Sequence, residues 1–174
     1  DCAQSQGSKY KNKYFGSIGD IGCFSFYPTK ILGAYGDGGL ILTKNSKIYH
    51  RIRRIRFYGI ETLNKKNKFF NEYFANEEGL NSRIDEIQAS ILNFKLSIVD
   101  NFIKRRREIA SLYFRELKST NLVMPKSNKH NFHVYHLFTV YHPKREKIIK
   151  ILKKKFVQTR IIYQHPIHKM TAYK

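Results

Sequence analysis

The chain has 174 residues, of which 41% are hydrophobic and 14% aromatic, enough to bury a core and too many for a disordered protein. No apolar run approaches the length of a membrane span, no signal-peptide pattern opens the chain, and the two cysteines, Cys2 and Cys23, match no metal or disulfide spacing. A soluble protein from a reducing, cytoplasmic setting, without a metal site, fits these features best.

The formal net charge of +20 raises the alternative of a basic nucleic-acid-binding module. The basic residues are spread over several segments, and many recur at helical spacing beside Ile and Leu, as on solvated helix faces. No zinc-finger spacing or RNA-recognition motif accompanies them. We therefore expect neither a nucleic-acid nor a membrane partner, and keep the basic module as the alternative.

The first part of the chain predicts two strands, one helix and a long loop. Residues 21–27 and 39–43 have the composition of strands. Residues 46–59 predict a helix that Ser46 caps and a glycine ends. Residues 60–80, rich in Asn and Lys, have no clean period and predict a loop.

The second part predicts long helices followed by a small α/β unit. Apolar residues recur at helical spacing after Ser82, which we expect to cap a helix, and a second helical pattern runs through residues 103–117. After a connector with Pro and Asn, residues 132–142 predict a strand, 143–156 a helix and 159–164 a strand. The chain begins without Met and stops without a closing element, so we expect a fragment of a longer chain.

Lys30 differs from the other lysines by its setting. It lies in the segment FSFYPTKILGAYGDGG, residues 24–39, with no other charge within six residues on either side. Such a lysine is paired, lies along an apolar surface, or takes part in chemistry. Apolar flanks desolvate an amine and favour its neutral form, which Schiff-base chemistry requires. Structural lysines are far commoner, so the setting alone leaves all three open.

Other features have simple structural interpretations when they are taken singly. Asp1 would begin a turn, Ser25 is one serine on a strand, and residues 79–89 read as a helix start, which can also bind an anion. The glycines of residues 33–39 match neither a P-loop nor a dinucleotide-binding motif, and more simply shape a tight return.

Five blocks nevertheless occur in a fixed order along the chain. They are Asp-x-Ala-Gln at 1–4, Gly-Asp at 19–20, Ser-Phe-x-Pro-Thr-Lys at 25–30, Gly-Asp-Gly-Gly at 36–39 and Asn-x-Arg-x-Asp-Glu-x-Gln at 81–88. In this order the blocks resemble the DegT/DnrJ/EryC1/StrS sugar aminotransferase family, through essentially the whole chain. The resemblance implies an α/β fold, the fold type I of pyridoxal-phosphate (PLP) enzymes. It also implies part of a large domain in residues 1–104 and a truncated small domain in residues 105–174.

The resemblance assigns roles residue by residue. Lys30 matches the lysine that forms the internal aldimine with PLP and moves the proton, and Asp1 matches the carboxylate that keeps the pyridine nitrogen protonated. Gln4 matches the side chain near the ring hydroxyl, and Ser25 a phosphate ligand. Asn81 matches an asparagine that reaches the cofactor phosphate of the neighbouring subunit, which implies a homodimer with shared sites.

The last segment, residues 159–174, resembles the substrate-facing run of relatives that aminate dTDP-linked 3-keto-6-deoxy sugars. Tyr163 and His168 are the substrate residues that this resemblance suggests. Four residues stand where these relatives commonly have others: Gln6, Ile162, Gln164 and Ile167. These departures bear on the sugar more than on the type of reaction.

The function implied is transfer of an amino group from L-glutamate to a nucleotide-linked keto-deoxy sugar, most similar to the dTDP sugars, for glycan or lipopolysaccharide assembly. The lysine argues against the dehydratase branch of the family, whereas ring-forming synthases also keep it. We expect the fragment alone to be inactive, because it lacks the half that supplies the phosphate-binding turn and the aromatic residue stacked on the ring. A non-catalytic remnant is the other alternative.

Overall fold

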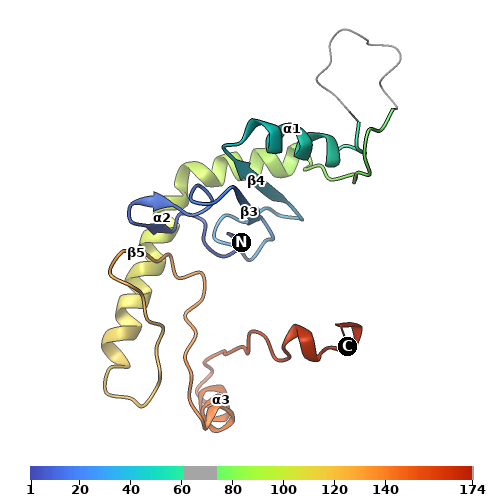
Figure 1. Cartoon of the computed structure of the whole chain (residues 1–174). Coiled ribbons are helices and arrows are strands. Elements are labelled where there is room, and N and C mark those ends of the chain that lie inside the picture. Colours follow the sequence, from blue (N-terminus) through green and yellow to red (C-terminus); the bar gives the residue numbers. More distant parts are fainter. Residues whose placement is uncertain (61–73, 174) are drawn as a thin grey trace. The chain divides into compact units, whose positions relative to one another are not determined.

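The structure is a computed structural model that describes residues 1–60 and 74–173 (Figure 1). The chain divides into two compact units. Unit 1 comprises Asp1–Lys118 and Lys126–Phe138, and unit 2 comprises Ser119–Pro125 and Thr139–Lys174. Among the described residues, unit 1 contains five strands and two α-helices, so the predicted mixture of helix and sheet is confirmed.

An antiparallel hairpin in unit 1 brackets the Lys30 segment. Strand β3 (Ile21–Ser25) pairs with β4 (Gly39–Thr43), and Ser25 lies opposite Gly39. The two predicted strands are confirmed, and the first ends two residues early. The connection between them continues from the paired ends, because the N–H of Phe26 donates to the carbonyl oxygen of Gly38 at 2.8 Å.

A second small sheet joins distant parts of unit 1. Its strand order is β2 (Lys13–Tyr14), β1 (Lys9–Tyr10), β5 (Asn131–Phe132), and both pairings are antiparallel. Strand β5 thereby fixes the segment after residue 131 beside the amino-terminal part of the chain.

Helix α1 (Ser46–Ile55) follows β4 directly. The predicted cap was wrong by one residue. The side chain of Asn45 accepts hydrogen bonds from the N–H groups of Lys47 and Ile48 at 2.9 and 3.2 Å, which leaves Ser46 inside the first turn. The helix also ends before Gly59, which adopts a left-handed conformation with φ of 75°.

Helix α2 (Glu86–Glu116) is one continuous helix of 31 residues, not the two predicted helical segments. Asp85 occupies the N-cap position without a side-chain cap hydrogen bond, so the predicted cap at Ser82 was wrong. The backbone N–H of Ser82 instead donates to the carbonyl oxygen of Arg56 at 2.9 Å. The expected domain boundary after residue 104 falls inside α2, and the domain division of the complete protein stays a prediction.

The core of unit 1 lies between α2 and the segment that carries Lys30 (Figure 1). One buried cluster contains Phe26, Leu32, Ala34 and Leu92. A second contains Ile31, Ile103 and Val134. The residues that follow Lys30 therefore belong to the core, and they fix the backbone of that segment against the helix.

Unit 2 contains α3 (Arg145–Lys154) and two short 3₁₀ helices, η1 (Ile167–Lys169) and η2 (Thr171–Tyr173). The predicted helix is confirmed, shorter at both ends. The expected strands 132–142 and 159–164 were wrong. Beyond β5, the first has only an isolated bridge between Tyr141 and Val123, and the second has no strand. An alternating pattern needs a partner strand to form a ladder, and the described residues supply none.

The predicted loop 60–80 lies largely outside the described residues. Within the described part of this segment, Ile60 and Ala75 form an isolated antiparallel β-bridge. In the part of the chain that the structure describes, no helix combines the length and the apolar character needed to cross a membrane.

Candidate active site

Lys30 lies at the end of a tight turn that follows β3. The N–H of Lys30 donates to the carbonyl oxygen of Tyr27 at 2.9 Å, and Pro28 occupies the second position of this turn, where its fixed φ is favourable. Lys30 is half-buried, and the next residue, Ile31, is buried. Among the described residues, no acidic side chain forms an ion pair with Lys30. A structural salt bridge within the described residues therefore does not explain why a lysine occupies position 30.

The return from Lys30 packs closely behind the turn at Gly33. A Cβ atom on Gly33 would lie 2.6 Å from the carbonyl oxygen of Pro28 and 2.9 Å from that of Tyr27. Both contacts are shorter than real Cβ contacts, so only glycine fits without a shift of the backbone. The glycine thus lets the two arms of the Lys30 segment touch.

Helix α2 binds the same segment through two polar side chains. The Nζ of Lys95 donates to the carbonyl oxygen of Gly33 at 2.7 Å and lies 4.3 Å from the centre of the Tyr35 ring. The Oε1 of Gln88 accepts from the N–H of Tyr35 at 2.8 Å. Sequence reasoning missed both residues as supports of the site. Gln88 ends the fifth motif block and could have been suspected, whereas no signal in the sequence distinguishes Lys95.

The amino-terminal segment lies beside β3. The N–H of Cys2 donates to the carbonyl oxygen of Cys23 at 2.7 Å, and the buried Gln6 donates through Nε2 to the carbonyl oxygen of Ser25 at 2.7 Å. Asp1 and Gln4 belong to this segment and are exposed. The segment that carries Asp1 and Gln4 therefore lies beside β3, the strand that ends at Ser25 and leads into the Lys30 turn.

The described contacts of Asn81 are made away from the Lys30 turn. It forms a bridge with Phe57, just beyond α1, and its Oδ1 accepts from the Nε of Arg83 at 3.0 Å. The side chain is exposed, and no described contact joins it to Lys30. Its role toward a neighbouring subunit stays a prediction.

Beside Asn81, an ion-pair cluster joins α1 to the segment before α2. Glu77 accepts from Arg51 at 2.9 Å and from Arg54 at 2.9 Å. The hydrogen bond from Arg51 has the largest effect on the Glu77 carboxylate and that from Arg54 the next largest, and both lower its pKa. The cluster fixes the backbone that carries Asn81 onto the end of α1.

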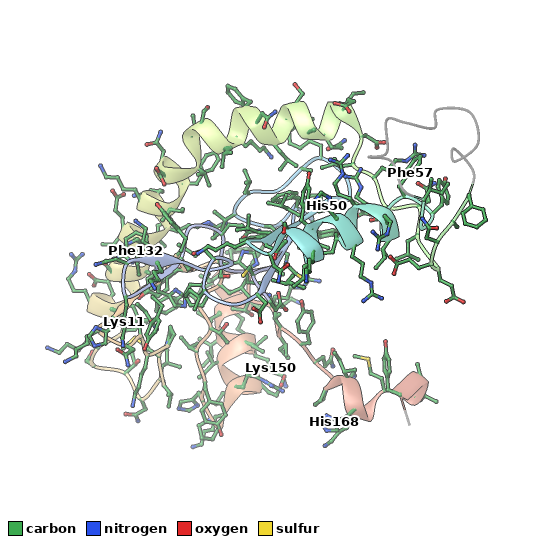
Figure 2. The ribbon with its side chains drawn as sticks, turned by 45° about the horizontal axis from the view of Figure 1, so that its top comes forward. Lys11, His50, Phe57, Phe132, Lys150 and His168 are labelled. Carbon is green, nitrogen blue, oxygen red and sulfur yellow. The ribbon has the colours of Figure 1, made fainter. Side chains whose placement is uncertain are left out.

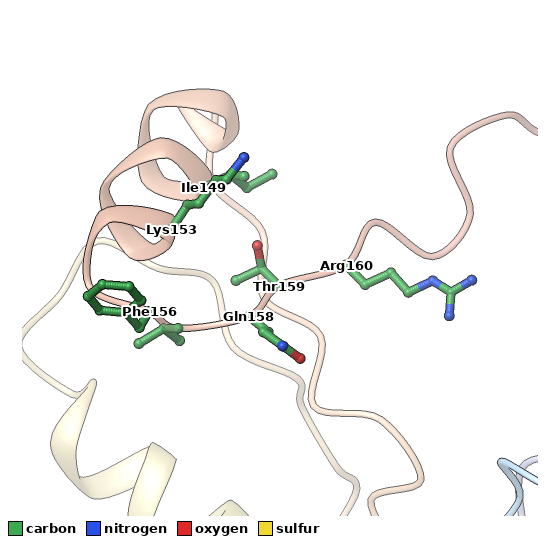
Figure 3. A pocket seen from close by; sticks show the side chains of 7 residues that line it. Ile149, Lys153, Phe156, Gln158, Thr159 and Arg160 are labelled. Atoms are coloured by element: carbon green, nitrogen blue, oxygen red, sulfur yellow. The ribbon is translucent and has the colours of Figure 1, made fainter.

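The suggested substrate residues Tyr163 and His168 belong to unit 2, and both are exposed. Figure 2 shows His168 in the last part of the chain. The same unit contains an open cavity of about 830 Å³ at the end of α3 (Figure 3). Its lining comprises Ile149, Lys153, Phe156, Val157, Gln158, Thr159 and Arg160. Neither Tyr163 nor His168 is among these residues, and their role stays a prediction.

Two histidines on the segment after β5 have lowered pKa values. Burial lowers the pKa of His133, and the charge of Arg107 adds to the effect. Burial also lowers the pKa of His136, with further contributions from the charges of Lys30 and Arg106. In the described residues, no group of three or more His, Cys, Asp or Glu side chains could hold a metal ion.

The side chains near β3 fit the chemistry of PLP, which needs an amine, an acceptor for its ring N–H and donors for its phosphate. Lys30 supplies the amine. Asp1 is exposed, and its Oδ1 accepts from the N–H of Ala3 at 2.8 Å; the described residues give its carboxylate no other hydrogen bond, so it can accept another. The Oγ of Ser25 accepts from the N–H of Tyr27 at 3.3 Å, which leaves its own O–H free to donate to a phosphate oxygen.

A half-buried lysine on a rigid turn, next to a carboxylate-bearing segment, defines a site suited to Schiff-base chemistry. Comparison with known proteins gives the family. The model of the DegT/DnrJ/EryC1/StrS aminotransferase family matches residues 1–174, and the chain belongs to this family.

Curated relatives and solved structures agree with this assignment. The chain is 38% identical over 178 residues to a dTDP-3-amino-3,4,6-trideoxy-alpha-D-glucose transaminase of Micromonospora megalomicea, covering 99% of this chain and 46% of the relative. It is 42% identical over 173 residues to a dTDP-3-amino-3,6-dideoxy-alpha-D-galactopyranose transaminase of Aneurinibacillus thermoaerophilus, with coverage of 99% and 45%. Other relatives have names that refer to UDP- or GDP-linked sugars.

The fold agrees with the crystal structure of a DegT DnrJ EryC1 StrS aminotransferase from Brucella abortus. The TM-score is 0.89 at 33% identity, covering 99% of this chain and 44% of that one. The α/β fold that the sequence resemblance implies is therefore confirmed. The chain spans about half the length of the curated relatives it matches.

Proposed function

We propose that the complete protein containing this chain is a PLP-dependent aminotransferase acting on a nucleotide-linked keto sugar, with L-glutamate as the amino donor. The observation that carries the proposal is the Lys30 turn, because it holds a half-buried amine that no described acid pairs. The family match and the names of the relatives supply the sugar class. A dTDP sugar is the first candidate, since both relatives described above are named for one.

In this proposal Lys30 holds the cofactor through Nζ and moves the proton during transamination. The carboxylate of Asp1 accepts the ring N–H and keeps that nitrogen positively charged, and Gln4 lies near the ring hydroxyl. Ser25 donates its hydroxyl to the phosphate. PLP itself, when bound, supplies the electron sink. The close packing of Gly33 and the hydrogen bonds from α2 serve to hold the amine in one place.

The remaining parts of the proposal concern partners and setting. We propose a homodimer in which Asn81, exposed and away from the contacts of the Lys30 turn, reaches the cofactor phosphate of the second subunit. Tyr163 and His168 are proposed to face the sugar. The protein is proposed to work in the cytoplasm, in glycan or lipopolysaccharide assembly, without a nucleic-acid or membrane partner.

The test uses the complete gene product that contains this chain, reconstituted with PLP. We expect the absorbance band of lysine-bound PLP, and we expect Lys30→Ala to abolish it. Lys104→Ala is the matched control, because it removes an exposed lysine of α2 that has no described contact with the Lys30 segment; it should keep the band. Persistence of the band in Lys30→Ala would refute the assignment of Lys30.

We also propose that the 174-residue chain alone does not transaminate. The support is its coverage of only about half of each curated relative. Turnover of a dTDP-linked keto sugar with glutamate by the purified chain would refute this part, while leaving the assignment of Lys30 intact.

A further inference from the structure

The side chain of Gln6 continues the pairing between β3 and the amino-terminal segment. The carbonyl oxygens of Cys23 and Ser25 point to the same edge of β3, because they belong to alternate residues of one strand. The backbone N–H of Cys2 donates to the first at 2.7 Å, and the Nε2 of Gln6 donates to the second at 2.7 Å. A side-chain amide thus takes the place of a backbone N–H at the last residue of the strand.

A tight turn over residues 5–8 fixes the backbone of Gln6. The N–H of the last residue of this turn donates to the carbonyl oxygen of the first at 2.9 Å. Gly7 has a φ of 82°, the positive value that a type II turn requires at its third position. A Cβ atom on Gly7 would collide with the Cδ1 of Ile103 in α2, so the turn is packed against the core. The direction of the Gln6 side chain is therefore set by the fold.

The amide of Gln6 is buried and makes one described hydrogen bond. Gln6 is 5% exposed, and its Oε1 has no hydrogen-bond partner among the described residues. Turning the amide over would bring Oε1 against the carbonyl oxygen of Ser25, and two acceptors do not pair. A buried polar atom without a partner costs stability. The bond to Ser25 is therefore the described contact for which this position needs an amide.

The peptide group that follows Ser25 is held at both ends. Gln6 binds its carbonyl oxygen, and its N–H, that of Phe26, donates to the carbonyl oxygen of Gly38 at 2.8 Å. Beyond this peptide group, the N–H of Tyr27 donates to the Oγ of Ser25 at 3.3 Å. Such a local contact forms only when the backbone between the two residues has the right conformation. It leaves the O–H of Ser25 as a donor.

We propose that Gln6 is a positioning residue for Ser25 and, through Ser25, for the phosphate group of PLP. The inference rests on the proposed function, in which the hydroxyl of Ser25 donates to that phosphate. Gln6 holds the carbonyl oxygen of Ser25, so the hydroxyl is oriented before the phosphate arrives. Less ordering then remains to be done on binding. The contribution of Gln6 is therefore to the phosphate group of the cofactor and not to its ring.

The first test compares PLP with pyridoxal, which has the same aldehyde and no phosphate, in the complete gene product. The dissociation constant of each is measured from the absorbance of the lysine-bound form. Gln6→Met keeps the size of the side chain and removes the amide. It should weaken PLP binding roughly fivefold, the scale of one neutral hydrogen bond, and leave pyridoxal binding nearly unchanged. Gln6→His supplies a ring N–H and should recover most of the loss.

Ser5→Ala is the matched control. The Oγ of Ser5 is also buried, in the same turn, and has no hydrogen-bond partner among the described residues. Its removal should change neither dissociation constant. If Ser5→Ala and Gln6→Met weaken PLP binding equally, the effect belongs to the turn and the positioning role is overturned.

A double variant tests whether Gln6 acts through Ser25. In a Ser25→Ala background, Gln6→Met should cause no further loss of PLP affinity, because the hydroxyl that it orients is gone. A full additional loss in this background overturns the proposal. So does an unchanged PLP affinity in Gln6→Met alone, or an equal weakening of PLP and pyridoxal, which a merely structural residue would give.

The second test needs no cofactor. Hydrogen exchange of the complete gene product without PLP should be faster over residues 24–28 in Gln6→Met than in wild type and Gln6→His, and equal over α3. If Gln6→Met does not fold, Gln6→Glu, which keeps the shape and replaces the donor by an acceptor, takes its place. If the wild-type protein shows no lysine-bound PLP, the proposed function fails, and exchange alone decides whether Gln6 orders Ser25. Unchanged exchange over residues 24–28 overturns that ordering.

Discussion

Replacing Gly33 by Ala should displace the turn that carries Lys30. The added Cβ would lie 2.6 Å from the carbonyl oxygen of Pro28 and 2.9 Å from that of Tyr27. Both atoms belong to the backbone of the turn, so no flexible side chain can give way. Overpacking of this kind costs about 1–3 kcal/mol in free energy of unfolding.

Gly19→Ala is the matched control for this change. A Cβ on Gly19 meets no atom within 4 Å, and its φ lies outside the left-handed region. Alanine there should leave stability unchanged or raise it by about 0.4–1 kcal/mol, because the unfolded chain loses freedom. The two variants should therefore differ by about 1–4 kcal/mol in the same chain.

The assay is urea denaturation of the chain followed by circular dichroism, with retention of PLP by the complete gene product as the second readout. Gly33→Ala should lower the denaturation midpoint and weaken the absorbance of lysine-bound PLP, and Gly19→Ala should do neither. Equal midpoints for the two variants would show that the close approach at Gly33 does not constrain the turn.

Two further changes test the surroundings of the site. Leu92→Ala should lower the free energy of unfolding by about 2–5 kcal/mol, because Leu92 is only 7% exposed in the core cluster. Phe94→Ala on the same helix should cost far less, because Phe94 is 69% exposed. Equal urea midpoints for the two variants would contradict this packing. Glu77→Gln should destabilise the chain at pH 7, and the difference from wild type should vanish in acid. Folding lowers the pKa of Glu77. The stabilisation from its ion pairs is therefore complete above the unfolded pKa of about 4.3 and is lost as the pH falls through the lower pKa of the folded state. A stability difference that does not change with pH would contradict the ion pairs.

Local pattern was enough to predict the elements that depend on neighbours in sequence. The β3–β4 hairpin, α1 and α3 follow from composition and helical period. The caps themselves failed by a few residues, since Asn45 and Ser46 are both suitable and only the backbone decides between them. The strand expected at 132–142 failed for a different reason, because its alternation says which side chains share a face but not whether a partner strand is present.

The residues of the candidate site also fall into those that the sequence marks and those that it does not. Lys30, Asp1 and Ser25 are marked by motif blocks, and the amino-terminal segment does lie beside the strand leading to the lysine. Lys95 and His136 are not marked, because neither belongs to a motif block and their neighbours in sequence do not show what the fold brings to them. Their surroundings depend on contacts across 62 residues for Lys95, and on the β5 segment for His136, which local pattern cannot reveal.

Helix α2 organises the site through its period. Residues along one face of the helix contact the return that follows Lys30. Gln88 contacts Tyr35, Leu92 packs with Ala34 and Leu32, Lys95 binds Gly33, and Ile103 packs with Ile31. Because the spacing of three and four residues keeps these side chains on one face, a single rigid helix fixes the whole return from Tyr35 to the lysine. The same helix continues to Arg106 and so fixes the segment of His136 as well. Helix α2 therefore anchors both the return that follows Lys30 and, through Arg106, the segment after β5.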